Sequence, residues 1–177
     1  FKTRQRPLLL CLLPYFVLGF FAGLRTSWLE QTHVGAQGAE WSLNFIERCL
    51  LAGKALWFYA CKILWPDDLN FVYPHWHIDA TEPTQYLYGL GVLCLLFLLW
   101  TWRTKIGRGA FILAAGYCGT LVPALGFFNL YPQRYSFVAD HFQYHAMPIL
   151  ILALVIVAMR FFNLFGENNN VTRLLFL

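Results

Sequence analysis

The chain alternates long apolar runs with short polar segments, and four of the apolar runs are long enough to cross a lipid bilayer. These runs cover residues 8–24, 84–102, 109–130 and 146–165. A membrane-crossing helix needs about 20 mostly apolar residues, so each run predicts one transmembrane helix. The third run is rich in small residues, which let helices approach closely in lipid. We therefore expect it to pack centrally.

A fifth segment, residues 42–65, is apolar enough for a helix but carries several charges. At about 100° per residue, Glu47, Lys54 and Lys62 fall within roughly one quarter of the helix circumference. This pattern predicts an amphipathic helix that lies in the membrane interface, re-enters the membrane or lines a polar interior. It is a poor candidate for a span exposed to lipid, and the pattern leaves open whether it crosses the bilayer.

The composition supports a membrane protein. Hydrophobic residues make up 59% of the chain and charged residues only 12%, about half the charged fraction of a soluble domain. The formal net charge of +4 comes from short clusters beside apolar runs, which is typical of topology signals and not of a nucleic-acid surface. We expect an all-α integral membrane fold, a single polytopic domain over residues 1–177, with membrane lipids as partners and no nucleic acid.

Two basic clusters orient the predicted spans. One precedes the first span and the other lies between the second and third: Lys2, Arg4, Arg6 and Arg103, Lys105, Arg108. If both are cytoplasmic, an even number of crossings separates them, so residues 42–65 do not cross. Residues 25–83 and 129–144 then lie on the exoplasmic side, and both termini are cytoplasmic. The alternative for the first run is a signal peptide, because it has a basic start and small residues near Ala22.

Two segments on the expected exoplasmic side, residues 65–77 and 131–145, hold most of the unusual polar side chains. Arg134 in the second segment suits a phosphate, because its planar guanidinium donates two parallel charge-assisted hydrogen bonds. A lipid phosphate would lie at the same depth. The alternative is that Arg134 pairs with Asp140 or with lipid headgroups in general.

Histidines in the same segments raise the question of a metal site. His141 and His145 are four residues apart, which places both on one face of a helix, and His75 and His77 add two more imidazoles. Their spacing matches no established zinc pattern. We therefore favour hydrogen bonding at the membrane interface, and we expect no metal.

Two stretches carry a family resemblance. Residues 47–52 followed by 64–70 (Leu-Trp-Pro-Asp-Asp-Leu-Asn) resemble the domain of unknown function found in transmembrane and tetratricopeptide-repeat proteins. Residues 128–130 and the run 134–144 (Arg-Tyr-Ser-Phe-Val-Ala-Asp-His-Phe-Gln-Tyr) look like a later loop of that family. The resemblance covers roughly residues 40–159.

This resemblance implies a multi-span glycosyltransferase of the GT-C class, similar to protein O-mannosyltransferases, in a bacterial inner membrane. Such an enzyme takes its sugar from a polyprenyl-phosphate donor at the exoplasmic face and needs no further cofactor. By analogy Arg134, His141 and Arg48 would contact the lipid phosphate, where fixed cations stabilise the leaving group. The supporting polar residues would be Tyr135, Asp140, Gln143, Tyr144, His75 and His77.

The chain also departs from the family pattern. The acidic motif that supplies the catalytic base and the helical repeats are not found in it, so we expect a fragment, the donor-side C-terminal half of the membrane domain, and assign no catalytic residue. A protein acceptor or partner subunits would complete the enzyme. The alternative hypothesis is a non-catalytic accessory subunit of a larger membrane complex. A transporter is disfavoured, because the spans hold few ionisable residues apart from Arg160.

Overall fold

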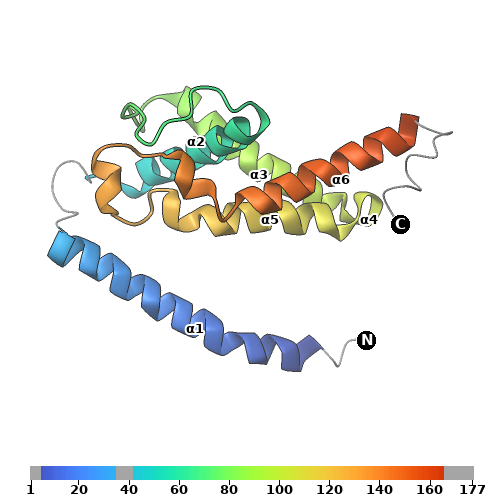
Figure 1. The fold of residues 1–177 in the computed structure, drawn as a ribbon, viewed down its shortest axis with the longest axis horizontal. Helices are drawn as coiled ribbons and strands as arrows, with labels where there is room; N and C mark the ends of the chain where they lie inside the picture. Colours follow the sequence, from blue (N-terminus) through green and yellow to red (C-terminus); the bar gives the residue numbers. More distant parts are fainter. Residues whose placement is uncertain (1–4, 35–41, 166–177) are drawn as a thin grey trace.

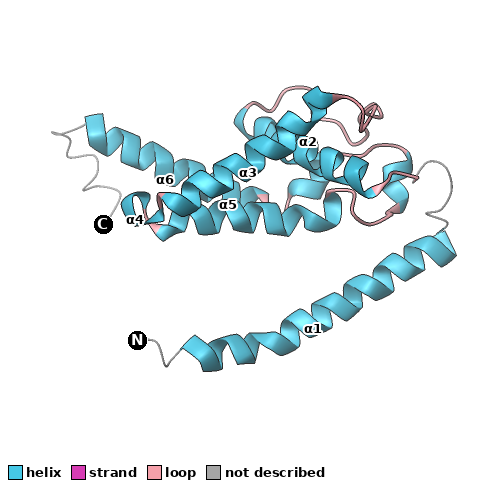
Figure 2. Ribbon diagram, turned by 180° about the vertical axis from the view of Figure 1, so that it is seen from behind, coloured by secondary structure: helices cyan, strands magenta, loops and turns pink. Residues whose placement is uncertain are grey.

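The computed structural model describes residues 5–34 and 42–165, and within these ranges the chain forms helices and no strands (Figures 1 and 2). The longer helices are α1 (Gln5–Leu29), α2 (Phe45–Leu64), α3 (Tyr86–Thr101), α5 (Arg108–Leu121) and α6 (Met147–Phe165). The short helical turns between them are Glu30–Val34, Pro83–Gln85, α4 (Arg103–Ile106), Val122–Ala124, Tyr131–Arg134 and Asp140–Gln143. The all-α prediction is therefore confirmed.

The amphipathic helix predicted over residues 42–65 is α2, and it forms the centre of the packed core. Its start is fixed by a capping box, in which the Asn44 side chain accepts the Glu47 N–H (2.9 Å) and the Glu47 carboxylate accepts the Asn44 N–H (2.8 Å). The buried residues of the helix are Leu50, Leu51, Ala52, Gly53, Ala55, Leu56 and Tyr59. The helix is therefore confirmed, and its place in the membrane interface, in a re-entrant segment or along a polar interior stays a prediction.

Small residues let α2 cross α3 closely. A Cβ added to Gly53 would lie 2.7 Å from the backbone nitrogen of Gly89, so no larger residue fits there without a shift. One turn later, the Trp57 indole N–H donates to the carbonyl of Tyr88 (2.9 Å). A close contact between two glycines and one hydrogen bond thus hold α2 and α3 together where they cross.

In the part of the chain that the structure describes, two helical stretches are long and apolar enough to cross a membrane, Leu10–Val34 and Pro83–Thr101. The first extends beyond the predicted 8–24, because neither Pro nor Gly interrupts the chain after Gly23. The third predicted span, 109–130, is wrong in its second half. α5 ends at Leu121, because Pro123 has no N–H to continue the helix, and Gly126 then turns the chain with a φ of +88°.

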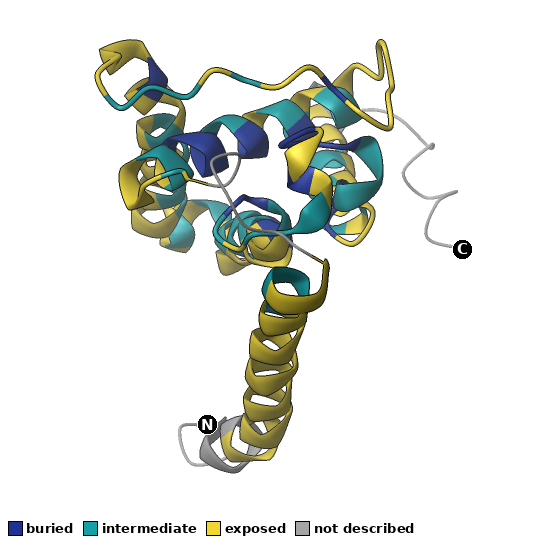
Figure 3. Cartoon of the chain, turned by 90° about the vertical axis from the view of Figure 1, so that its left-hand side faces the viewer, coloured by how far each residue is buried: buried dark blue, intermediate teal, exposed yellow. Residues whose placement is uncertain are grey.

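The bundle has two distinct ends (Figure 1). The turn containing α4, the start of α1 and the end of α6 lie at one end, which we call the α4 end. The segments 65–77 and 131–145, named here the first and second loop segments, lie at the other, the loop end. α1 stands apart from the bundle with its side chains exposed along most of its length (Figure 3). At the loop end, the Tyr131 N–H donates to the Glu30 carboxylate (2.9 Å).

Candidate functional site

The two loop segments pack against each other at the loop end of the bundle. The Tyr73 N–H donates to the Ser136 hydroxyl (3.1 Å), and the His75 Nε2 lies 3.0 Å from the Gln133 carbonyl oxygen. Gln133 and Ser136 are both buried. Polar groups buried in this way are costly unless they are paired, so these contacts give the two segments a defined arrangement.

Asp140 is the main link between the two segments. Its carboxylate accepts the Asn70 N–H (2.6 Å) and the Tyr73 hydroxyl (2.9 and 3.1 Å to its two oxygens). Burial raises the pKa of the Tyr73 hydroxyl, and the neighbouring Asp140 carboxylate raises it as well. The phenol therefore stays protonated at neutral pH and can donate to the carboxylate. Asp140, predicted as a supporting residue, holds the loops together.

Arg134 and two histidines border one open pocket, which we call the Arg134 pocket. Its volume is about 390 Å³, and it is lined by Leu43, His75, Trp76, His77, Ile78, Arg134 and Phe137. The His75 ring lies 4.1 Å from the Phe137 ring between centroids, which helps to fix its orientation. Beside the pocket, the Lys54 ammonium sits 4.6 Å from the centroid of the Trp76 ring. Three of the predicted site residues, Arg134, His75 and His77, thus line one opening.

His141 occupies a different place. Its ring stacks on Phe71 (centroids 4.4 Å apart, planes 16° apart) and meets Phe142 edge-on, and it does not line the Arg134 pocket. The helical face predicted for His141 and His145 is wrong, because residues Asp140–Gln143 form a 3₁₀ turn and α6 begins only at Met147. Within residues 5–34 and 42–165, no group of three or more His, Cys, Asp or Glu side chains is arranged to hold a metal ion.

Three further predicted residues lie along the second loop segment. Tyr135 is exposed, and its hydroxyl lies 3.3 Å from that of Tyr131. Tyr144 is also exposed, whereas Gln143 is buried. None of the three lines the Arg134 pocket, so their contribution to a phosphate site stays a prediction.

Arg48 is half-buried on α2, where its guanidinium ties together distant parts of the chain. It donates to the carbonyl of Gly126 (2.6 Å), the side-chain oxygen of Asn129 (2.7 Å) and the carbonyl of Leu43 (3.1 Å). These contacts brace the turn after α5 against the start of α2. They give Arg48 a structural role, and the predicted contact with a lipid phosphate stays a prediction.

Lys62 and Tyr73 matter here but do not stand out in the sequence. The Lys62 ammonium donates to the carbonyls of Asp67 and Asp68, and it lies 5.3 Å from the Tyr73 ring centroid. It thereby anchors the start of the first loop segment to the end of α2. Lys62 binds backbone carbonyls, which every residue has, so the sequence does not reveal this contact. Tyr73 bonds to Asp140, which is 67 residues away in the chain.

No protein-family model, curated protein or solved structure matches the chain. The resemblance to the glycosyltransferase family therefore stays a hypothesis that rests on residues 47–52, 64–70, 128–130 and 134–144.

Proposed function

We propose that the chain is the donor-side part of a polyprenyl-phosphate-dependent glycosyltransferase, and that the Arg134 pocket binds the phosphate of the lipid-linked sugar. The observation that carries the proposal is the meeting of Arg134 with His75 and His77 at one pocket, although the two loop segments are more than 50 residues apart in the chain. The Arg134 guanidinium offers several N–H donors to one anion, and the His77 imidazole at the same pocket can add another. This donor set fits a phosphate.

The proposal includes a four-span arrangement in a bacterial inner membrane, in which α6 and α5, the latter continued by the turn Val122–Ala124, join α1 and α3 in crossing the bilayer. The basic α4 turn would then face the cytoplasm, together with both termini, and the loop segments would face the exoplasm. Several large apolar side chains of the first loop segment are exposed, among them Trp65 (76%), Leu69 (57%) and Phe71 (75%). Their exposure supports a position of the loop segments at the exoplasmic surface of the membrane. Such residues are stable at the headgroup level of a membrane.

In this proposal the chain binds and orients the donor. Arg134 would hold the phosphate and stabilise the charge that grows on it as the sugar–phosphate bond breaks. The Asp140–Tyr73 link would keep Arg134 and His75 at a fixed separation during that step. The base that activates the acceptor hydroxyl is not assigned to any residue of this chain.

The test is the affinity of the purified full chain for farnesyl phosphate, a short prenyl phosphate, measured by calorimetry in detergent. Arg134→Ala should weaken binding about 10- to 150-fold, as expected for one charge-assisted contact of about 1.5–3 kcal/mol. The affinity of Arg134→Lys should lie between those of the unchanged protein and Arg134→Ala, because Lys keeps the positive charge but lacks the planar guanidinium. The matched control is Arg103→Ala at the α4 end, which should bind as the unchanged protein does. Equal affinity of the Arg134→Ala and unchanged proteins would refute the proposal.

A second candidate function is an accessory subunit of a larger membrane complex. The observation that favours it is α1, whose apolar side chains are exposed along most of its length (Figure 3). A helix this exposed can pack against another membrane protein. Cross-linking from Phe16 (73% exposed) in native membranes distinguishes the two: a cross-linked partner protein supports the subunit, and cross-links to lipid alone count against it.

A further inference from the structure

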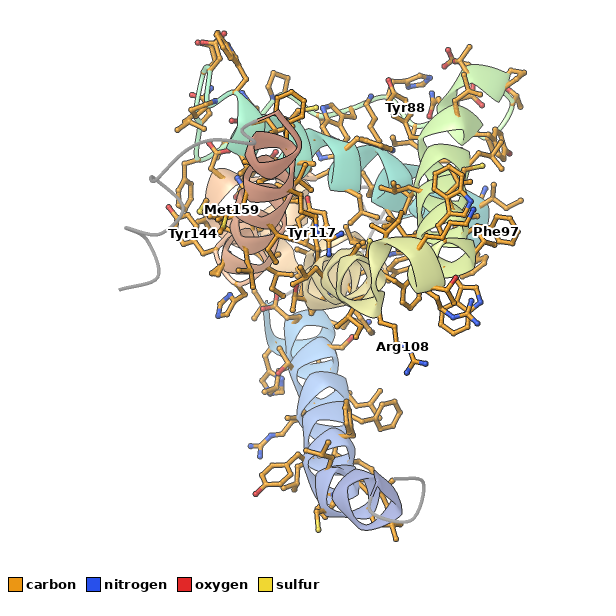
Figure 4. All side chains as sticks on the ribbon, turned by 90° about the vertical axis from the view of Figure 1, so that its right-hand side faces the viewer. Tyr88, Phe97, Arg108, Tyr117, Tyr144 and Met159 are labelled. Atoms are coloured by element: carbon orange, nitrogen blue, oxygen red, sulfur yellow. The ribbon has the colours of Figure 1, made fainter. Side chains whose placement is uncertain are left out.

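A second and larger cavity lies between α2, α3, α5 and α6, and it shares no lining residue with the Arg134 pocket. Its volume is about 590 Å³, and apolar side chains line most of it, among them Leu95, Leu99, Ala114, Ala153 and Val157. Figure 4, seen from the α4 end, shows α6 and α3 on either side of α5, with Tyr117 between them. We call this space the α5 cavity, because it runs along α5 from Gly109 to Cys118.

The dimensions of the α5 cavity suit a lipid chain better than a protein helix. Along α5 it reaches from Gly109 to Cys118, about 13 Å at a rise of roughly 1.5 Å per residue. That length is close to half of the hydrocarbon core, which is about 30 Å thick. A helix about 10 Å across and equally long would fill roughly 1,000 Å³, well above the cavity volume.

One mouth of the cavity is cationic. Arg160 borders it and donates to the carbonyl of Ile106 (2.6 Å) at the turn where α5 begins. It is the one charged residue in the sequence of α6, and a charge within an apolar helix is costly unless it finds a partner or reaches the interface. The first turn of α5 beside it has no side-chain cap. An anion at this mouth would therefore meet positive potential from both Arg160 and the start of α5.

We propose that the α5 cavity binds one anionic phospholipid. One acyl chain would lie along α5 between α3 and α6, and the headgroup phosphate would contact Arg160 at the α4 end. The charge of Arg160 and the length of the cavity, which matches one membrane leaflet, together select this occupant. The site is independent of the donor pocket, which lies at the opposite end of the bundle.

The experiment compares two lipids that differ only in headgroup charge. The full chain is purified with equal amounts of phosphatidylglycerol and phosphatidylcholine of the same acyl chains, and the retained lipid is measured by native mass spectrometry. We expect phosphatidylglycerol to be retained about tenfold over phosphatidylcholine, which corresponds to about 1.4 kcal/mol. Arg160→Gln should abolish this preference, and Arg160→Lys should keep most of it, because Lys still offers a point charge.

The matched control is Arg108→Gln, because Arg108 belongs to the same basic turn but points away from the bundle (Figure 4). It should retain the preference. Ala114→Phe fills the cavity and should lower the retention of both lipids. If that variant does not fold, the Arg160 and Arg108 pair still decides the result. Three results would overturn the proposal. The unchanged protein could retain the two lipids equally, or Arg160→Gln and Arg108→Gln could lose the preference for phosphatidylglycerol to the same extent. The third is that another protein, and no lipid, is retained.

Discussion

Arg48→Met separates the structural role of Arg48 from the phosphate-binding role that the family resemblance implies. Methionine preserves most of the side-chain volume but donates no hydrogen bond. The substitution therefore removes the contacts to Gly126, Asn129 and Leu43. It leaves α2 free to form, since its capping box at Asn44 and Glu47 is unaffected.

The expected loss of stability follows from these contacts. A hydrogen bond to a charged group contributes about 1.5–3 kcal/mol. Because Arg48 is half-buried and its contacts are not additive, we expect a total loss of about 3 kcal/mol, near the value for one strong contact. For a chain of this size that corresponds to a fall of roughly 6–12 °C in the unfolding midpoint.

The assay is thermal unfolding of the purified chain in detergent, followed by tryptophan fluorescence. The control is Arg25→Met, because Arg25 is exposed on α1, and its midpoint should stay within about 2 °C of the unchanged protein. If Arg48→Met also stays within that range but loses affinity for farnesyl phosphate, the structural role is refuted and the phosphate role gains support.

Two other substitutions test the packing around the site. Gly53→Ala should destabilise the chain by about 1–3 kcal/mol, because its Cβ would meet the backbone of Gly89 at 2.7 Å. The control Gly89→Ala should unfold at no lower a temperature than the unchanged protein, because its Cβ meets nothing within 4 Å and Ala favours a helix over Gly. Asp140→Asn should weaken the link to Tyr73 by about 1 kcal/mol and increase backbone hydrogen exchange in residues 67–73. Unchanged exchange in these residues would contradict the role of Asp140 in holding the two loop segments together.

The periodic and apolar segments could be predicted from the sequence, and the prediction is confirmed for α2, α3 and α6 to within three residues. It failed in the third run, because an apolar stretch of 22 residues, 109–130, looks continuous in composition. Pro123 and Gly126 end the helix by backbone geometry, which hydropathy does not register.

The candidate site could be predicted only in part. The polar residues of the two loop segments stand out in the sequence, and the structure brings Arg134, His75 and His77 together. Their pairing could not be foreseen, because it depends on contacts between segments more than 50 residues apart. For the same reason nothing in the sequence indicates that Arg48 binds the carbonyl of Gly126, 78 residues away.

The most direct test of the donor pocket is to map where a prenyl phosphate binds. A farnesyl phosphate analogue with a photoreactive group next to its phosphate is cross-linked to the full chain in membranes, and the labelled peptides are identified by mass spectrometry. We predict labelling in residues 75–78 and 131–137, which unlabelled farnesyl phosphate competes away. Labelling that is confined to residues 103–108 and Arg160, or that is not competed, would contradict the assignment of the Arg134 pocket as the donor site.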